Sequence, residues 1–331
     1  MQRIIQAGLG EMGRQWAETV AASRRWEATA YVDPDRKNLM DAASRHGMPP
    51  DRCFQSVPEA LAAIEADALL DVAPADTRAR NALAAFDWEL DVLCEKPLAS
   101  RLADAKNLAE AAERMQRILL VAQDYRYQPA VETLRRQIAQ QRIGAVGYVD
   151  IHFHRGPRWD NYREQMAYPL ILDMTIHHVD MLRFLLDSDV RSVRVSSHAP
   201  GWSWFKGDAM VMAQWEMENG VVANYSASWV SRGWETPWNG QWRIEGEKGA
   251  LLLEDDVPYF SNKPSSRRKL APVKMRNHRQ AALLAEFGRC VTQRAEPQTS
   301  ARRNLNSLAA THAMVRAAKR GGRVNLRELL R

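Results

Sequence analysis

The sequence predicts two domains of different class. Residues 1–125 are expected to form an α/β domain with a doubly wound parallel sheet, because short apolar strands alternate there with helix-length segments. Residues 126–331 are expected to form an α+β domain on a largely antiparallel, open sheet, because several segments after residue 146 alternate apolar and polar side chains. A chain of 331 residues has room for two such domains.

The first predicted strand, residues 3–9, runs into a glycine-rich turn and then into a helix over residues 14–23. The turn contains Gly8, Leu9, Gly10, Glu11, Met12 and Gly13. Its G-x-G-x-x-G spacing, between a strand and a helix, is that of a dinucleotide-binding Rossmann domain. The first glycine permits a tight turn, the second lets pyrophosphate approach the backbone, and the third lets the helix pack closely. The alternative is a glycine-rich turn without a ligand.

The next predicted strand, residues 28–32, ends in Asp33. Its distance from the glycines suits an acid that binds the adenosine ribose. A carboxylate accepts hydrogen bonds from ribose hydroxyls and repels a 2′-phosphate, so Asp33 favours NAD as the cofactor. Arg36 lies nearby in the sequence and leaves NADP as the alternative.

The alternation of strands and helices continues to residue 122. Helices are expected over residues 35–46, 57–65, 76–86 and 100–117, with Ser100 as an N-cap, and strands over 69–73, 92–94 and 118–122. The strand over 92–94 is followed by Glu95, Lys96 and Pro97. Ligands bind at the carboxyl ends of strands in such sheets, so this lysine can reach a bound ligand. An ordinary strand exit with solvated charges is the alternative.

The second half is expected to be a sheet with few helices. Its elements are a helix over residues 128–141, strands over 147–155, 190–198, 208–217, 221–231, 241–246 and 250–253, a basic loop over 258–272, helices over 278–292 and 302–320, and a strand over 323–326. The dipeptide Asn219-Gly220 is typical of a hairpin turn. An alternative is that the C-terminal helix and strand pack on the first domain.

One further helix is expected over residues 170–187, and it carries Asp173, His177 and Asp180 at i, i+4 and i+7. This spacing places the three side chains on one face of a regular helix, among apolar residues. A carboxylate beside an imidazole orients the ring and raises its basicity, as a general base requires. The alternative is a core histidine that a local acid satisfies.

Composition and charge restrict the class of protein. The formal net charge of +6 indicates a solvated basic surface that would favour anionic substrates, and no nucleic-acid partner is expected. No apolar run is long enough for a bilayer, and the first strand begins close to Met1, so neither a membrane anchor nor a signal peptide is expected. Cys53, Cys94 and Cys290 show neither metal-ligand spacing nor a disulfide pattern, which predicts no metal and a cytoplasmic location.

Four motifs occur in order along the chain: Gly8-x-Gly10-x-x-Gly13, Val72-Ala73-Pro74-Ala75-Asp76-Thr77, Cys94-Glu95-Lys96-Pro97-Leu98 and Tyr125-Arg126-Tyr127-x-Pro129. Taken together, they resemble the Gfo/Idh/MocA family of nicotinamide-dependent oxidoreductases. The segment from Asp173 to His177 also resembles the D-x-x-x-H helix of this family. The chain departs from it at Ala73-Pro74-Ala75, where relatives usually have Thr-Pro-Pro, and at residues 166–170, where many have a glycine-rich segment.

The resemblance implies an NAD(P)-dependent dehydrogenase that acts on a secondary alcohol of a sugar, an inositol or a related cyclic polyol. His177 would be the base, Asp173 would orient it, and Lys96 would hold the reacting hydroxyl. The implied cofactor-binding residues are Gly8, Leu9, Gly10, Glu11, Met12, Gly13, Asp33, Arg36, Ala73, Pro74, Asp76, Glu95, Lys96, Gln123 and Arg126. The implied substrate-binding residues are Lys96, Arg126, Arg158, Trp159, Tyr168, Asp173 and His177.

Three other activities fit the same resemblance. They are an NAD-retaining glycosidase, a catalytically silent sugar- or NAD-sensing regulator, and a biliverdin- or dihydrodiol-type reductase. The family also implies a homodimer or homotetramer assembled through the open sheet of the second domain, which the sequence suggests is rich in tryptophan and methionine.

Overall fold

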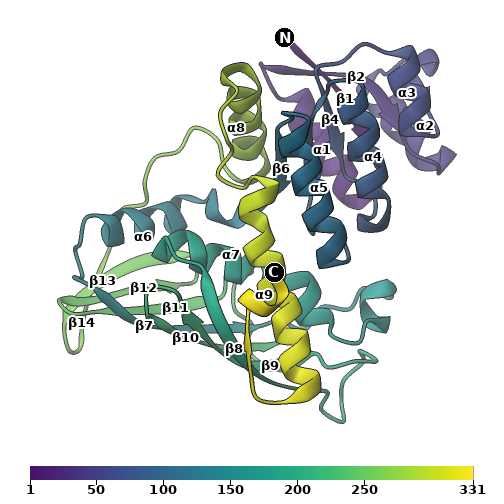
Figure 1. Cartoon of the computed structure of the whole chain (residues 1–331). Coiled ribbons are helices and arrows are strands. Elements are labelled where there is room, and N and C mark those ends of the chain that lie inside the picture. Colours follow the sequence, from purple (N-terminus) through teal and green to yellow (C-terminus); the bar gives the residue numbers. More distant parts are fainter. Residues whose placement is uncertain (331) are drawn as a thin grey trace. The chain divides into compact units, whose positions relative to one another are not determined.

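The computed structural model describes residues 1–330, which form two compact units (Figure 1). The first unit comprises residues 1–124 and 276–305, and the second comprises residues 125–275 and the segment from residue 306 onward. The sequence divides the chain once, at residue 125, whereas in the structure the segment 276–305 returns to the first unit.

The first unit is built on six parallel strands in the order β3-β2-β1-β4-β5-β6, which confirms the predicted doubly wound sheet. The strands are β1 (Gln2–Ala7), β2 (Trp26–Val32), β3 (Cys53–Phe54), β4 (Ala68–Asp71), β5 (Asp91–Glu95) and β6 (Leu119–Ala122). The helices are α1 (Glu11–Ala21), α2 (Arg36–His46), η1 (Pro50–Arg52), α3 (Val57–Ala63), α4 (Ala75–Asp87), α5 (Leu102–Arg114) and α8 (Arg279–Gln293). Helices pack against this sheet, and most of its central strands is buried: residues 4–7 of β1, all of β4 and residues 91–94 of β5.

Helix α8 belongs to the first unit because aromatic packing holds it there. The indole of Trp26 stacks on the ring of Phe287 with 5.3 Å between centroids, and its N–H donates to the carbonyl oxygen of Leu284 at 3.1 Å. Both contacts join residues more than 250 positions apart in the sequence, so no local pattern could have indicated them.

The second unit contains a nine-stranded sheet in the order β14-β13-β12-β11-β7-β10-β9-β8-β15. The strands are β7 (Val146–His154), β8 (Val190–His198), β9 (Met210–Met217), β10 (Val222–Ser228), β11 (Gln241–Gly246), β12 (Gly249–Glu254), β13 (Val257–Lys263), β14 (Ser266–Lys269) and β15 (Arg323–Asn325). All neighbours are antiparallel except β7 and β10, so the largely antiparallel sheet is confirmed.

Two expectations about this sheet are wrong. Residues 258–272 are not a loop: β13 pairs with β14 as a hairpin there, and residues 257–261 of β13 also pair with β12. The last strand does not return to the first unit, since β15 pairs with β8.

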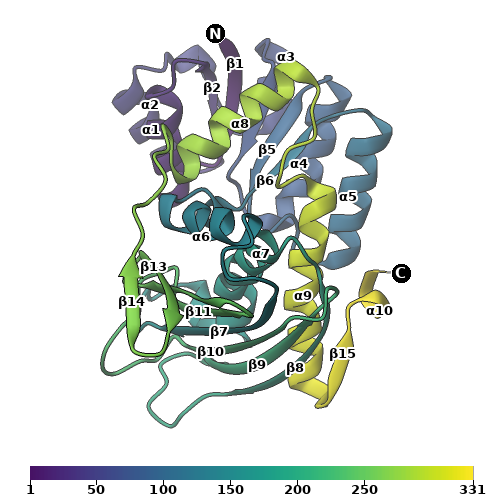
Figure 2. The same cartoon turned by 90° about the vertical axis from the view of Figure 1, so that its left-hand side faces the viewer.

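Helices cover one face of this sheet (Figure 2). The helical elements after β6 are η2 (Asp124–Arg126), α6 (Pro129–Ala139), η3 (Tyr162–Gln165), the π-helical turn η4 (Leu170–Met174), α7 (Thr175–Leu186), α9 (Ala301–Arg320) and α10 (Arg327–Leu330). The strand tryptophans Trp215 and Trp242 are buried, and Trp215 stacks on Tyr225 with 5.0 Å between ring centroids. These two tryptophans therefore belong to the core of the second unit.

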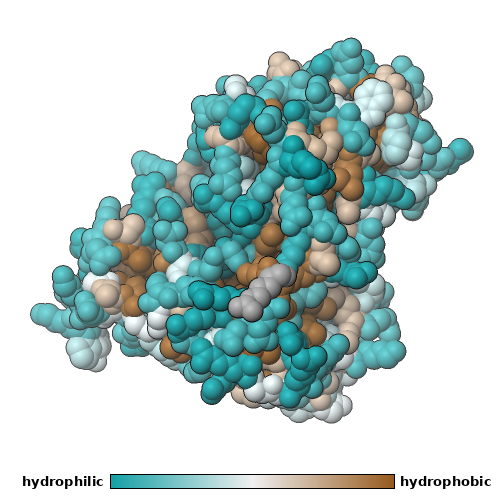
Figure 3. Space-filling model, in the orientation of Figure 1, coloured by the Kyte–Doolittle hydropathy of each residue, from teal (hydrophilic) through white to brown (hydrophobic). Residues whose placement is uncertain are grey.

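The surface is mainly hydrophilic in the orientation of Figure 3, where hydrophobic residues gather in small separate patches. Among residues 1–330 we find no helix with the length and apolar character needed to cross a bilayer.

Candidate functional site

The glycine turn between β1 and α1 has the geometry of a phosphate-binding loop. Gly8 has φ +90°, and a Cβ there would lie 2.6 Å from the backbone nitrogen of Ala73. A Cβ on Gly13 would lie 2.1 Å from the carbonyl oxygen of Gly8, so α1 can approach the turn only with glycine at this position. A Cβ on Gly10 would meet nothing within 4 Å, so Gly10 faces open space at the start of α1. The three glycines thus have the three roles expected for a pyrophosphate site.

Asp33 follows β2 and supports this turn. Its carboxylate accepts hydrogen bonds from the backbone N–H of Leu9 at 2.7 Å and of Asp35 at 2.9 Å. Each carboxylate oxygen has a second lone pair for another donor, such as a ribose hydroxyl. Asp35, which the sequence did not single out, is the N-cap of α2, and Arg36 is the first, exposed residue of this helix.

The turn after β5 carries Lys96 beside two carboxylates. Glu95 accepts hydrogen bonds from the Trp16 indole at 2.8 Å and from the backbone N–H of Lys96 at 3.0 Å. Burial raises the pKa of Glu95, and burial also raises the pKa of Asp124. The positive charge of Lys96 acts to lower both values, so Lys96 lies close enough to interact with both carboxylates. Asp124 also forms an ion pair with Arg279 at 3.1 Å.

The loop after β4 is anchored from two sides. Pro74 is the N-cap of α4, and the Asp76 side chain in the first turn accepts a hydrogen bond from the Ser100 hydroxyl. The expected capping role of Ser100 is therefore wrong: α5 begins at Leu102, and Ser100 connects this helix to α4 instead.

A buried charged cluster lies beneath these two loops, and no sequence motif indicates it. Arg78 on α4 donates to the carbonyl oxygens of Ala73 and Pro97. Asp71, at the end of β4, accepts hydrogen bonds from Ala73 N–H at 3.0 Å and from the Asn81 amide at 3.3 Å. An isolated arginine on an amphipathic helix is normally a surface residue, so only the three-dimensional packing identifies this one.

Gln123 lies at the end of β6 and is 1% exposed, yet neither polar atom of its side-chain amide has a partner among the described residues. A buried amide normally has hydrogen-bond partners, so a bound ligand or water is expected to supply them. Together with the open space at Gly10, this unsatisfied amide shows that the first unit fits a bound dinucleotide. Gly8 to Gly13 and Asp33 would hold its adenosine diphosphate half.

The second unit presents His177 at the start of α7. The helix expected over residues 170–187 is interrupted, because both the N–H and the hydroxyl of Thr175 bond to the carbonyl of Leu170 and make a π-helical turn. Such turns are frequent at functional sites. Asp173 lies in this turn, so its relation to His177 is not the i, i+4 relation of a regular helix.

His177, Asp173 and Arg126 each contact another side chain of the second unit. The His177 ring stacks on Tyr125 with 4.4 Å between centroids, and Asp173 forms an ion pair with Arg163 at 2.8 Å. The Arg126 guanidinium donates two hydrogen bonds to Asp180, at 2.6 and 2.8 Å. Orientation of His177 by Asp173, and binding of cofactor or substrate by Arg126, stay predictions.

The other expected substrate residues lie in an aromatic and basic part of the second unit. Arg158 stacks on Trp204 with 4.3 Å from its guanidinium carbon to the ring centre, and Trp159 packs against Trp229 at 4.9 Å between centroids. The Lys319 ammonium lies 5.9 Å from the Tyr168 ring centre. These contacts account for the packing of the three residues, and their binding to substrate stays a prediction.

His178 is fully buried and connects α7 to β10 and to the segment before β11. The Tyr225 hydroxyl lies 2.9 Å from its Nδ1, and its Nε2 lies 3.0 Å from the carbonyl oxygen of Trp238. The carbonyl can only accept, so Nε2 carries the proton and the Tyr225 hydroxyl donates to Nδ1. Burial lowers the pKa of His178 from 6.5 to about 4, although the bond to Trp238 acts to raise it.

This pKa predicts a loss of stability in acid. Between pH 6.5 and 4 the unfolded chain binds a proton at His178 that the folded chain does not bind. The free energy of unfolding therefore has its full value above pH 6.5 and decreases as the pH falls toward 4. The full loss is about 3 kcal/mol. Urea unfolding from pH 4 to 8 should show a weaker pH dependence for His178→Gln than for the wild type. The exposed His198→Gln is the control, and parallel curves for His178→Gln and the wild type would contradict the prediction.

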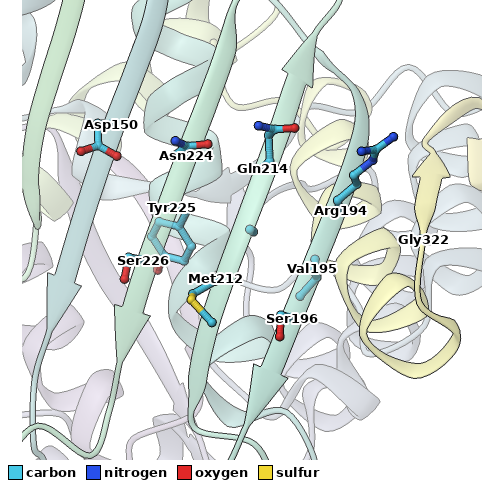
Figure 4. Close-up of a pocket in the computed structure, with 11 residues that line it drawn as sticks. Asp150, Arg194, Val195, Ser196, Met212, Gln214, Asn224, Tyr225, Ser226 and Gly322 are labelled. Carbon is cyan, nitrogen blue, oxygen red and sulfur yellow. The ribbon is translucent and has the colours of Figure 1, made fainter.

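The open face of the second sheet has a hollow of about 560 Å³ (Figure 4). Asp150, Asn224, Gln214 and Arg194 lie side by side across β7, β10, β9 and β8. Met212 is 52% exposed on the same face. Within residues 1–330 no group of three or more His, Cys, Asp or Glu side chains is placed to hold a metal ion.

Comparison with known proteins identifies both halves of the chain. A family model described as an oxidoreductase family with an NAD-binding Rossmann fold matches residues 3–123, and the model of the Gfo/Idh/MocA C-terminal domain matches residues 131–252. The chain is 25% identical to a 1,5-anhydro-D-fructose reductase of Ensifer adhaerens over 334 residues, which cover 97% of each protein. It is 33% identical to an inositol 2-dehydrogenase of Paracoccus denitrificans over 199 residues, which cover 58% of this chain and 56% of that protein.

The fold matches a solved structure over nearly its whole length. An oxidoreductase from Agrobacterium radiobacter, crystallised with NAD+, L-tartaric acid and magnesium, superposes with a TM-score of 0.90 at 19% identity over 99% of both chains. The two family models together cover most of residues 3–252. The chain therefore belongs to the Gfo/Idh/MocA family of NAD-binding oxidoreductases.

Proposed function

We propose that the chain is an NAD-dependent dehydrogenase that oxidises a secondary alcohol of a sugar, an inositol or a related cyclic polyol. The observation that carries the proposal is Lys96, placed on the turn after β5 at the carboxyl edge of the NAD-binding sheet, with Glu95 and Asp124 beside it. Relatives named as an inositol 2-dehydrogenase and a 1,5-anhydro-D-fructose reductase support the substrate class.

When bound, NAD supplies the hydride acceptor, nicotinamide C4. In the proposed reaction the carbinol C–H bond breaks with its electron pair, the hydroxyl proton passes to the imidazole of His177, and a ketone forms. Lys96 holds the reacting hydroxyl and stabilises the negative charge that develops on its oxygen. Glu95 fixes the backbone of the lysine turn, because its carboxylate accepts the Lys96 N–H. Lys96 belongs to the first unit and His177 to the second.

A substrate screen tests the proposal. Purified protein is incubated with NAD or NADP and with inositols, aldoses and glycosides, and both the reduced cofactor and the sugar products are quantified. We expect equal amounts of NADH and ketone from one of the free polyols or sugars. Release of a reducing sugar without net NADH would indicate the NAD-retaining glycosidase, and binding without turnover would indicate the sensor. Biliverdin with NADH or NADPH, and a dihydrodiol with NAD or NADP, are tested in parallel. Turnover of only one of these compounds would indicate the biliverdin- or dihydrodiol-type reductase.

The cofactor preference is expected to be NAD over NADP. Asp33 would repel a 2′-phosphate, so calorimetry should give a smaller dissociation constant for NAD than for NADP. Asp33→Ala should reduce the difference between these two dissociation constants. Asp33 also holds Leu9 N–H, so the substitution is expected to weaken both cofactors, and the ratio of the two constants is the informative quantity. NADP binding tenfold tighter than NAD binding would show that Arg36 overrides Asp33.

The protein is proposed to form a homodimer or homotetramer through the open face of the second sheet. Light scattering at micromolar concentration should give a mass of at least two chains. Met212→Glu, in the middle of that face, should reduce the mass toward one chain, because it would bury a charge in the interface. Met40→Glu on α2, which is 54% exposed, is the control. A monomeric wild type would refute the assembly.

We also propose a cytoplasmic location, in keeping with three free thiols.

A further inference from the structure

Arg78 joins two neighbouring loops of the first unit. It is 2% exposed, and its guanidinium donates to the carbonyl oxygen of Ala73 at 2.8 Å and to that of Pro97. Ala73 lies in the loop after β4, and Pro97 lies in the turn after β5 that also carries Lys96. Since β4 and β5 are adjacent in the sheet, one side chain connects the two loops at its carboxyl edge.

The cluster has its own counter-charge. Asp71 is fully buried at the end of β4, and burial raises its pKa to about 6 although the charge of Arg78 acts to lower it. Asp71 also accepts a hydrogen bond from the backbone N–H of Ala73, and Arg78 donates to the carbonyl oxygen of the same residue. Both backbone polar groups of Ala73 are therefore bound by this cluster. Burial of an arginine side chain costs free energy. The guanidinium of Arg78 offsets part of this cost by donating to two carbonyl oxygens.

The loops that Arg78 joins lie in the half of the sheet away from Asp33. A Rossmann sheet consists of two mononucleotide-binding halves, and β1, β2 and β3 with Gly8 and Asp33 form the half for adenosine. The half formed by β4, β5 and β6 is left for the nicotinamide nucleotide. The carbonyl groups of Ala73 and Pro97 thus flank the part of the site where hydride transfer takes place.

We propose that Arg78 is a positioning residue that fixes the loop at Ala73 and the turn of Lys96 for the nicotinamide half of NAD. This inference rests on the proposed function, because it assumes that Lys96 acts on a substrate beside the nicotinamide. Arg78 itself touches neither cofactor nor substrate in this role. It acts through the two carbonyl groups that its guanidinium holds.

The test separates the two halves of the cofactor. Arg78→Met is compared with Arg80→Met, which removes an exposed arginine from the same helix. Calorimetry measures NAD and ADP on each protein, because ADP needs only the half at Gly8 and Asp33. Arg78→Met should weaken NAD binding by about tenfold or more, as expected for loss of hydrogen bonds to a charged group, and should change ADP binding less than twofold. Arg80→Met should match the wild type for both ligands.

The Lys variant keeps the test decisive if Arg78→Met does not fold. Arg78→Lys retains the charge but can reach one carbonyl rather than two, so its NAD affinity should fall between that of the wild type and the tenfold loss, again with ADP binding unchanged. Equal loss of NAD and ADP binding would indicate a general structural role, and unchanged NAD binding in both variants would indicate no role. Either result overturns the positioning role. A wild type that binds ADP but not NAD would overturn the proposed function as well, which distinguishes the two failures.

Discussion

Replacement of His177 by alanine is expected to reduce turnover by about a hundredfold or more and to leave NAD affinity unchanged. A positioned general base typically contributes about 10²- to 10⁴-fold to the rate, and the variant has no group to accept the hydroxyl proton. The glycine turn and Asp33 are in the first unit, so the adenosine half of NAD does not depend on His177. Steady-state turnover on the substrate found in the screen and calorimetry with NAD measure the two effects.

His198→Ala, at the exposed end of β8, is the matched control and should keep full activity. Full activity of His177→Ala would remove the base assignment and leave the sensor as the better account. Asp173→Asn is the less direct experiment, because Asp173 forms an ion pair with Arg163 and its replacement would disturb that partner too.

Lys96→Ala is expected to reduce turnover by a similar factor, about a hundredfold or more. The ammonium group is the cation proposed to stabilise the developing alkoxide, and removal of one such group usually costs about 10²- to 10³-fold in turnover. Its loss also removes a positive charge that acts to lower the pKa of Glu95 and of Asp124, although Arg279 still pairs with Asp124. The comparison of turnover with the exposed Lys248→Ala measures the effect. A loss of less than threefold would contradict the proposed role of Lys96.

The glycine turn shows which features the sequence predicts well. Its neighbours in space, β1 and α1, are also its neighbours in sequence, and the spacing of Gly8, Gly10 and Gly13 itself encodes the close approaches seen in the structure. The strand that ends at Glu95 is similarly local, since a run of buried residues leads directly to Lys96.

The features that the sequence did not predict depend on long-range contacts. The ion pair between Asp124 and Arg279 joins residues 155 positions apart, and no period or motif relates them. Arg78 looks like an ordinary surface arginine until α4 packs its side chain beneath two loops. The π-helical turn before His177 forms because the carbonyl oxygen of Leu170 accepts hydrogen bonds from both the N–H and the hydroxyl of Thr175. The spacing of apolar residues in the sequence does not indicate such a turn.

Isotope transfer tests the central claim most directly. The substrate is labelled with deuterium on the carbinol carbon and turned over with NAD, and the nicotinamide ring of the product is analysed by mass spectrometry. The proposed dehydrogenase should place one deuterium at nicotinamide C4 for each ketone formed, and His177→Ala should slow this transfer by about the same factor as turnover. Product formation with the deuterium retained in the sugar and the cofactor left as NAD would contradict net oxidation and support glycosidic cleavage.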